Sequence, residues 1–349
     1  MLTESRLRQL LRSFAQLRIG VVGDFFLDAY YDCDPRLDER SLETGRTCYQ
    51  VVRTRRQAGA AGTVAANLAA LGVGRVEAVG FCGDDGEGYE LRRAMKGLGL
   101  NLDGFICRPD RFTPTYGKPC YVDSARPGLP VREELERLDT KNRRPTPRDL
   151  QDQLIDHLEA QLPTWHGAVL LDQVSEPGCG VLTARVRRFL AEQARQRPDQ
   201  IFLADSRQLI GFFRQVMIKP NQFEATRALG STNRRPPALR TSTAHAQALS
   251  RRSGRPVFLT LGERGMLVAQ GSEVEHVAAF PVEGPIDPVG AGDSTSAALV
   301  ASLSAGAELG EAALVANLAA SITIQQLGTT GTASPTQILR RHRQTRHAL

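Results

Sequence analysis

Residues 287–293 read Asp287-Pro288-Val289-Gly290-Ala291-Gly292-Asp293, and the chain then enters the small, apolar run 294–303. Two glycines allow a sharp bend, and the alanine-rich run favours a helix whose first N–H groups have no partner inside the helix. A helix start of this kind binds anions. We expect Gly290, Ala291 and Gly292 to form an anion hole in which the N–H groups of Ala291, Gly292 and Asp293 hold the charge. We expect Asp293 also to be the base that deprotonates a hydroxyl. The simpler alternative is a tight turn with Asp293 as the helix N-cap.

The composition is that of a globular chain. It has 349 residues, of which 41% are hydrophobic, and a formal net charge of +6. This length suits one large domain with an appendage, or two domains. The basic C-terminal residues 340–346 fit a solvated helix end better than a nucleic-acid site, and no stretch approaches transmembrane length. We therefore expect a cytoplasmic protein that binds neither nucleic acid nor membrane.

The cysteines and the N-terminus agree with the expected cytoplasmic location. The six cysteines form no Cys-x-x-Cys pair and have no histidine at metal-ligand spacing, so neither a disulfide framework nor a zinc site is indicated. Leu7, Leu10 and Leu11 share one helical face, which predicts a packed first helix. A transit peptide is the lesser alternative.

Short apolar runs rich in β-branched residues alternate with helical patterns along the chain. The expected buried strands are 18–23, 76–80, 168–172, 201–205, 216–219 and 257–261. This alternation predicts an α/β fold with a mostly parallel central sheet flanked by helices. Ligands bind at the carboxyl ends of such strands, so the residues to inspect are Asp24, Asp172, Asp205, Asn221 and Gly262.

Two regions interrupt the alternation. Residues 31–57 and 105–139 are rich in Thr, Tyr, Val and Pro and suggest a small antiparallel sheet. We interpret this sheet as a lid that excludes water from a substrate, although a dimerisation sheet is an alternative and both roles are compatible. The expected main α/β domain comprises 1–30, 58–104 and 141–349, and the expected lid comprises 31–57 and 105–140. A homodimer through the lid is expected.

Several motifs occur in the order typical of one enzyme family. They are Gly23-Asp24-Phe25-Phe26-Leu27-Asp28, the Gly/Ala-rich segment 59–72, Arg137-Leu138-Asp139, residues 287–293 and the ending 327–331. With these motifs the chain resembles the ribokinase-like (PfkB) carbohydrate kinases over nearly its whole length, and among them the kinases of D-glycero-β-D-manno-heptose 7-phosphate. The resemblance implies a ribokinase-like fold and ATP-dependent transfer of a phosphoryl group to a sugar hydroxyl. We expect the kinase part alone, without the adenylyltransferase of fused versions.

The resemblance also implies the residues on the sugar side. Asp28 corresponds to the family's acceptor of hydrogen bonds from sugar hydroxyls, and Asp24 is a weaker candidate. Gly59 brings the backbone close to the sugar, and Thr63 stands where the family usually has a sugar-binding asparagine. Lys118 meets a phosphate if the substrate carries one, although a solvated strand lysine is the alternative.

Two departures leave the acceptor open. Gln173-Val174 stands where the heptose kinases have tyrosine and a nearby lysine, and Asp205-Ser206-Arg207 stands where they have Asp-Pro-Lys. An unphosphorylated hexose, a ketose phosphate or a nucleoside is therefore an alternative acceptor. A catalytically silent sugar-binding protein is a less favoured alternative, and an arginine-rich nucleic-acid binder is a remote one.

On the nucleotide side, Asn221-Gln222-Phe223-Glu224 matches the family's Asn-x-x-Glu, whose glutamate holds Mg²⁺ through water. Thr260, Gly262 and Gly265 are expected beside the ribose and phosphates of ATP. No P-loop motif and no Gly-x-Gly-x-x-Gly is present, so these other nucleotide folds lack support.

Three further residues complete the implied site. Asn317 corresponds to the family's asparagine near adenine, with a hydrogen-bonded core asparagine as an equal alternative. Arg207 takes the place of a lysine that meets ATP phosphate. Asp287, with the backbone of residues 328–331, resembles the family's monovalent-cation site, which suggests K⁺.

Overall fold

The protein is described by a computed structural model, which covers residues 2–126, 128–232 and 235–346. Within these residues the largest sheet has nine strands in the order β16-β15-β14-β13-β12-β11-β1-β6-β7. All neighbours are parallel except the β14–β15 and β15–β16 pairs. The strands are β1 (Arg18–Gly23), β6 (Arg75–Gly83), β7 (Asn101–Arg108), β11 (Gly167–Asp172), β12 (Ile201–Ser206), β13 (Met217–Ile218), β14 (Val257–Thr260), β15 (Met266–Gln270) and β16 (Glu273–Val277). The mostly parallel sheet and all six expected strands are confirmed.

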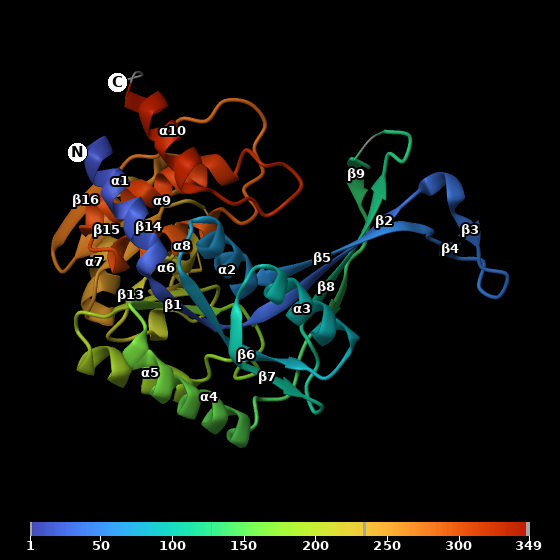
Figure 1. Cartoon of the computed structure of the whole chain (residues 1–349), viewed down its shortest axis with the longest axis horizontal. Coiled ribbons are helices and arrows are strands. Elements are labelled where there is room, and N and C mark those ends of the chain that lie inside the picture. Colours follow the sequence, from blue (N-terminus) through green and yellow to red (C-terminus); the bar gives the residue numbers. More distant parts are fainter. Residues whose placement is uncertain (1, 127, 233–234, 347–349) are drawn as a thin grey trace.

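Helices cover both faces of this sheet (Figure 1). Alternate residues of a strand point to opposite faces, and accordingly Val21 belongs to one apolar core and Val22 to the other. The first core includes side chains of α1 (Glu4–Ser13), α2 (Ala61–Ala70), α3 (Gly86–Gly97), α8 (Ala291–Ser304), α9 (Leu309–Thr323) and α10 (Pro335–Arg346). The second includes α4 (Arg148–Gln161), α5 (Ala184–Gln196), α6 (Gln222–Ala228) and α7 (Leu239–Ser253). The expected packed first helix is α1.

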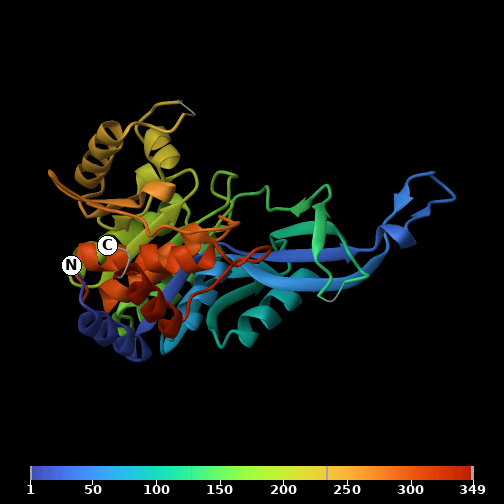
Figure 2. The same cartoon turned by 90° about the horizontal axis from the view of Figure 1, so that it is seen from above.

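A second sheet projects from the α/β body as a long arm (Figures 1 and 2). Its order is β10-β8-β2-β5, and β9 pairs with β8. The strands are β2 (Phe25–Cys33), β5 (Val51–Ala60), β8 (Thr115–Val122), β9 (Val131–Glu134) and β10 (Leu138–Thr140), and β3 (Glu39–Arg40) pairs with β4 (Thr47–Cys48) at the tip. We call this sheet and its tip the lid.

The lid differs from its expected form in two respects. The β2–β8 pair is parallel, so the expectation of a purely antiparallel sheet is wrong. The lid also begins earlier than residue 31, because β2 pairs from Phe25 and β5 continues to Ala60, whereas Phe105 pairs within the large sheet. Only Asp24 separates β1 from β2, so the same stretch of chain passes from the body into the lid.

The two faces of the lid have different surroundings. Leu27 and Ala29 of β2 lie in the first core together with Leu91 and Met95 of α3. Asp28 stands between Leu27 and Ala29 and therefore belongs to the other face of the lid. The lid thus has an apolar face on α3 and a polar face that carries the expected sugar-binding carboxylate.

A buried carboxylate stabilises the outer part of the lid. Asp32 is fully buried and accepts hydrogen bonds from Arg53 Nε at 2.6 Å and from Arg55 Nη2 at 2.9 Å. The two guanidinium groups lower the pKa of Asp32 in spite of its burial, which by itself would raise the pKa. The pairs join β2 to β5.

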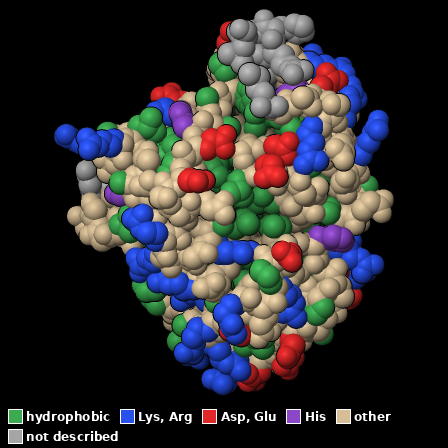
Figure 3. All heavy atoms as spheres, turned by 90° about the vertical axis from the view of Figure 1, so that its left-hand side faces the viewer, with side chains coloured by type: hydrophobic (Ala, Val, Ile, Leu, Met, Phe, Trp, Pro, Cys, Tyr) green, Lys and Arg blue, Asp and Glu red, His purple; other side chains and the backbone are tan. Residues whose placement is uncertain are grey.

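The face turned away from the lid carries arginines and acidic side chains close to one another (Figure 3). Ion pairs also join distant segments of the chain: Arg6 lies 3.1 Å from Glu311, and Arg343 lies 2.8 Å from Glu4. In the described residues, no helix combines the length and the apolar character that crossing a bilayer requires.

Candidate active site

Helix α8 begins at the glycine bend. Its N-cap is Gly290, whose φ of 82° lies in the left-handed region that favours glycine. No side chain of the described residues caps α8, and the N-cap is Gly290, so the alternative of Asp293 as the N-cap is wrong. The N–H of Ala291 donates to the carbonyl oxygen of Pro288 at 3.2 Å, whereas the N–H groups of Gly292 and Asp293 have no acceptor among the described residues. Two backbone donors at the positive end of the helix dipole are therefore free to bind an anion.

Asp293 stands in the first turn of α8 and is half-buried. Burial raises its pKa to about 7, and the nearby carboxylate of Asp205 adds to the rise, whereas the cation of Lys219 opposes it. A carboxyl group with a pKa near 7 exchanges its proton readily at neutral pH. Asp293 thus has the protonation behaviour that a general base requires.

Lys219 follows β13 and lies beside the same helix start. It is 4% exposed, and its Nζ is 2.9 Å from Asp205 Oδ2. A Cβ atom placed on Gly292 would lie 3.6 Å from this Nζ, so the ammonium group adjoins the free N–H groups of α8. Burial by itself would lower the pKa of Lys219, but Asp205, Glu224 and Asp293 raise it above its ordinary value. The side chain is therefore a buried cation.

The sequence analysis did not assign Lys219 to the site. Its signal was present, because the chain has a lysine directly before Pro220 and Asn221 at the carboxyl end of an expected strand. Asp205, at the end of the neighbouring strand β12, also accepts a hydrogen bond from Ser296 Oγ of α8 at 2.9 Å. Asp205 therefore links the lysine to the helix that starts at the glycine bend.

Asn221 and Glu224 form a capping box at the start of α6. Asn221 Oδ1 accepts hydrogen bonds from the N–H groups of Phe223 and Glu224, each at 2.9 Å. Glu224 Oε2 accepts one from the Asn221 N–H at 2.8 Å. Burial raises the pKa of Glu224 to about 7, and Asp205 adds to the rise. The box fixes the carboxylate in place and leaves Oε1 without a hydrogen-bond donor among the described residues.

A cavity of about 520 Å³ joins most of the expected nucleotide residues. Thr260, Gly262, Gly265 and Asn317 line it, and the cavity reaches Ala291 and Gly292 at the start of α8. Its other walls, which the sequence analysis missed, include Phe280, Pro281, Val282 and Ile286. Apolar walls that end at an anion-binding helix start suit a flat base at one end and phosphates at the other.

Asn317 lines this cavity from α9. Its Nδ2 donates to the carbonyl oxygens of Val277 at 3.1 Å and Ala278 at 3.0 Å. Both amide hydrogens have acceptors, so the group left to a ligand is the acceptor Oδ1. Asn317 therefore agrees with both alternatives: it is hydrogen-bonded to the core, and it borders the cavity.

Asp28 and Lys118 meet on the polar face of the lid. Lys118 Nζ lies 3.0 Å from Asp28 Oδ1 and 3.2 Å from the hydroxyl oxygen of Tyr30. The Lys118 side chain is 14% exposed, so the alternative of a solvated strand lysine is wrong. Burial by itself would lower its pKa, but Asp28 and Tyr30 raise it. The charge of Asp28 also adds to the raised pKa of Asp293 in the first turn of α8.

Gly59 and Thr63 lie where the lid joins the body. A Cβ atom on Gly59 would come within 2.5 Å of Asp28 Oδ2, so only glycine leaves room for this carboxylate. Thr63 is buried in α2, and its carbonyl oxygen accepts a hydrogen bond from Asn67 Nδ2 at 3.0 Å. Asn67 Nδ2 also lies 3.4 Å from the carbonyl oxygen of Gly331 and thereby joins α2 to the segment after α9.

Backbone N–H groups surround the carboxylate of Asp24. Its Oδ2 accepts hydrogen bonds from the N–H groups of Gln173 at 2.8 Å and Val174 at 3.1 Å, and its Oδ1 accepts one from Val181 at 2.8 Å. The carboxylate thus fixes the loop after β11. Burial raises the pKa of the neighbouring Asp172 to about 7, and Asp24 adds to the rise. With both oxygens engaged by the backbone, Asp24 does not remain among our sugar-binding candidates.

Asp287 and Arg207 lie at the edge of the site. Asp287 Oδ1 accepts the N–H of Val289 at 3.0 Å, and Oδ2 accepts that of Gly328 at 3.1 Å, so Asp287 joins the glycine bend to the loop after α9. Arg207 is exposed, and its charge lowers the pKa of Asp293 against the stronger effect of burial. Across residues 2–126, 128–232 and 235–346, no three His, Cys, Asp or Glu side chains gather as a metal-binding group.

Known proteins resemble this chain in sequence and in fold. Residues 184–337 match the family described as pfkB family carbohydrate kinase. The bifunctional protein HldE of Rhodopseudomonas palustris (strain BisA53) is 30% identical over 310 residues, which are 88% of this chain and 60% of that protein. The chain thus spans about 60% of the length of this curated relative.

Two solved structures have the same fold. Arabidopsis thaliana ribokinase, complexed with ribose and ATP, has a TM-score of 0.66 at 17% identity, with 93% of this chain and 98% of that chain covered. Escherichia coli phosphofructokinase-2, in complex with fructose-6-phosphate, has a TM-score of 0.64 at 17% identity, with 94% and 99% covered. These likenesses establish the ribokinase-like fold. The family match and the sequence similarity to HldE over 88% of this chain identify residues 184–337 as a pfkB family carbohydrate kinase domain.

Proposed function

We propose that the protein transfers the γ-phosphoryl group of ATP to a hydroxyl of a sugar phosphate, and that D-glycero-β-D-manno-heptose 7-phosphate is the acceptor. The observation that carries the proposal is the cavity that ends at Ala291 and Gly292, where free N–H groups, Lys219 and Asp293 meet. A base with raised pKa beside an anion-binding helix start is the arrangement that phosphoryl transfer to an alcohol needs.

On the nucleotide side, the apolar walls hold the adenine ring, and Asn317 Oδ1 accepts a hydrogen bond from its amino group. The N–H groups of Gly292 and Asp293, together with Lys219, contact the γ-phosphate oxygens. These donors stabilise the charge that spreads over the phosphoryl oxygens in the transition state.

Glu224 is the residue that fits a hydrated Mg²⁺, because its carboxylate is fixed by the capping box and one oxygen is left. When bound there, the ion neutralises charge on the β- and γ-phosphate oxygens. Among the described residues, Lys219 is the only cation that forms an ion pair with Asp205. Three acidic side chains, Asp205, Glu224 and Asp293, thus act on one buried lysine. Excess carboxylate charge next to phosphate favours a bound cation.

A potassium ion beside Asp287 and the backbone of residues 328–331 is a further proposal, which the K⁺ dependence of kcat tests.

On the acceptor side, Asp28 accepts hydrogen bonds from sugar hydroxyls and Lys118 binds the acceptor's phosphate. Lys118 supports a phosphorylated acceptor because it is a cation buried in the lid next to Asp28. The lid then shields the hydroxyl from water while Asp293 removes its proton. The rate of ADP release with a panel of sugars separates the alternative acceptors. If an acceptor without phosphate gave the same rate as heptose 7-phosphate, the assignment would be contradicted.

Asp293→Asn tests the base. The amide keeps the size of the side chain but cannot accept the proton, so kcat should fall by about 10² to 10⁴, the usual contribution of a positioned base, with ATP affinity retained. Steady-state kinetics and calorimetric titration with an ATP analogue measure the two quantities. Turnover like that of the unmodified protein would overturn the role of Asp293.

The pH dependence of kcat tests the charges around Asp293. Its pKa is raised to about 7, and the base acts only when deprotonated, so kcat should fall as the pH drops through this value. Lys219→Gln removes a cation that lowers this pKa, so the acid limb should move to higher pH, and loss of a phosphate donor should reduce kcat by about 10². Asp205→Asn removes a carboxylate that raises the pKa, so its limb should move to lower pH.

The opposite directions of these two shifts make the comparison specific. A general loss of structure would lower kcat in both variants without moving the limbs apart. Limbs that move together, or that stay in place in both variants, would contradict the assignment of Asp293 as the titrating base.

We also propose a homodimer formed through the lid. Exposed apolar side chains gather on lid segments, and they are Leu37, Leu42, Tyr49, Val51, Val52, Val131 and Leu138. A second copy of the lid would bury these side chains. Light scattering should give twice the chain mass of 38.1 kDa, and the double change Leu42→Glu and Val51→Glu should give a monomer. Phe212→Glu is the control, since Phe212 is 60% exposed on the body. A monomeric unmodified protein at micromolar concentration would refute the dimer.

A further inference from the structure

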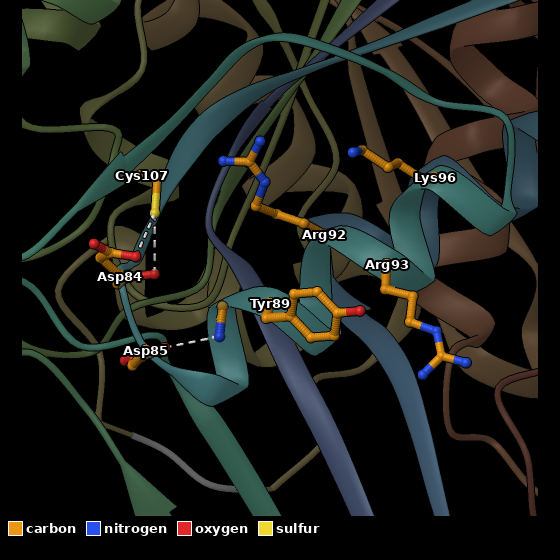
Figure 4. Close-up of a pocket in the computed structure, with 9 residues that line it drawn as sticks. Asp84, Asp85, Tyr89, Arg92, Arg93, Lys96 and Cys107 are labelled. Carbon is orange, nitrogen blue, oxygen red and sulfur yellow. Dashed lines mark hydrogen bonds between the residues drawn. The ribbon is translucent and has the colours of Figure 1, made fainter.

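A second cavity, of about 430 Å³, lies between α3 and the ends of β6 and β7 (Figure 4). The turn after β6 and Cys107 of β7 form one side, and the outer surface of α3 forms the other. Its lining includes Asp84, Asp85, Tyr89, Arg92, Lys96 and Cys107. The proposed phosphoryl transfer uses none of these residues.

The cavity is separate from the candidate active site. Leu91 and Met95, on the buried side of α3, pack in the core with Leu27 and Ala29 on the apolar face of the lid. Asp28 belongs to the opposite face of the same strand. The helix and the thickness of the lid therefore lie between this cavity and the expected acceptor.

Two cations on α3 have no acidic partner in the part of the chain that the structure describes. Arg92 and Lys96 are one helical turn apart, and both extend toward the side of the cavity where Asp84 and Cys107 lie (Figure 4). Among the described residues neither makes a hydrogen bond or an ion pair. Like charges at this spacing repel each other, and a bound anion would remove the repulsion. The neighbouring Arg93 differs, because it extends to the other side and lies 3.7 Å from Glu90.

The two acidic residues of the cavity, Asp84 and Asp85, differ in how far their oxygens are engaged in hydrogen bonds. Asp85 caps α3, and its oxygens accept hydrogen bonds from the Gly88 N–H at 2.7 Å, the Thr113 N–H at 2.9 Å and the Thr113 hydroxyl at 2.6 Å. Asp84 is exposed, and the Sγ of Cys107 lies 3.8 Å from its Oδ1. Asp84 thus keeps acceptor capacity for hydroxyl groups of a ligand.

Tyr89 adds a flat apolar surface. Its side chain is 68% exposed at the edge of the cavity. An aromatic ring beside a few polar groups is typical of small-molecule sites, where the ring packs against an apolar face of the ligand. The cavity therefore offers three kinds of contact: a pair of cations, a free carboxylate and an aromatic ring.

We propose that this cavity binds a phosphorylated sugar. Arg92 and Lys96 bind the phosphate, Asp84 accepts hydrogen bonds from the sugar hydroxyls, and the ring of Tyr89 packs against the sugar. The site is additional to the acceptor site, and it does not depend on the proposed phosphoryl transfer. Because α3 packs on the lid, a sugar phosphate bound in this cavity would contact the same helix that the lid contacts.

Cys107 gives a direct measure of occupancy. It is an exposed free cysteine in the cavity wall, so a bound ligand should shield it from alkylation. The experiment measures the alkylation rate of the Cys107 peptide by mass spectrometry, with iodoacetamide and without ATP. Glucose 6-phosphate is the probe, and glucose and inorganic phosphate are compared with it. Cys48, at the tip of the lid, is the internal reference.

We expect glucose 6-phosphate to slow alkylation of Cys107 about tenfold at ten times its dissociation constant, with Cys48 unchanged. Glucose should protect much less. The double variant Arg92→Gln and Lys96→Gln should abolish the protection, whereas Arg188→Gln with Arg251→Gln, which removes the same charge from exposed positions of α5 and α7, should retain it. Should the first double variant not fold, Lys96→Gln alone, at an exposed position, provides the comparison.

Three results would overturn the proposal. They are the absence of protection at millimolar glucose 6-phosphate, protection that persists in the Arg92 and Lys96 variants, and equal protection by glucose. In the first of these cases, protection by inorganic phosphate alone would show that the sugar does not fit. A failure of phosphoryl transfer would change none of these results, since the measurement needs no turnover.

Discussion

The buried ion pair between Lys219 and Asp205 holds together the region on which the proposed chemistry depends. A lysine that is almost completely buried keeps its charge only if carboxylates compensate the loss of water. Asp205 does this at 2.9 Å, and the same carboxylate receives a hydrogen bond from Ser296 of α8. The pair therefore fixes the ends of β12 and β13 against the helix that starts at the glycine bend. Both members also act on the pKa of Asp293, which burial raises: Asp205 adds to the rise, and Lys219 opposes it.

Burial and charge give the remaining acidic residues distinct tasks. Asp24 is occupied by three backbone N–H groups and stabilises a loop. Glu224 is held by a capping box, so its position is set by the start of α6. Asp293 has no such partner among the described residues, and its raised pKa follows from burial near other carboxylates. Residues of the same type thus differ in role because their hydrogen-bond donors differ. Motif position made Asp24 a weaker candidate for the sugar because it does not reveal these donors.

Much of the fold could be predicted from the sequence because buried parallel strands are apolar over their whole length. The stretches at 18–23 and 201–205 are clear for this reason. The start of β2 was harder to recognise, since Phe25–Leu27 continues the apolar run of β1 after a single aspartate. The parallel pairing of β2 with β8 joins segments far apart in the chain, and no local pattern specifies the direction of such a pair.

The candidate site was predictable where a motif lies on one segment. The glycine bend, the Asn221–Glu224 motif and the residues after β14 are local, and the structure brings them to one region. Lys219 ends an expected strand, which was a signal for it, but its contacts with Asp205 and Gly292 depend on how separate segments pack together. The apolar walls at 280–286 were missed because they belong to an irregular loop without periodicity.

The most direct test of the account is a crystal structure of the protein with Mg²⁺ and a non-hydrolysable ATP analogue. The account predicts that the base occupies the cavity lined by Asn317 and that the γ-phosphate oxygens lie within hydrogen-bond distance of Lys219 Nζ and the N–H groups of Gly292 and Asp293. A nucleotide bound at another place, or a γ-phosphate directed away from the start of α8, would contradict it.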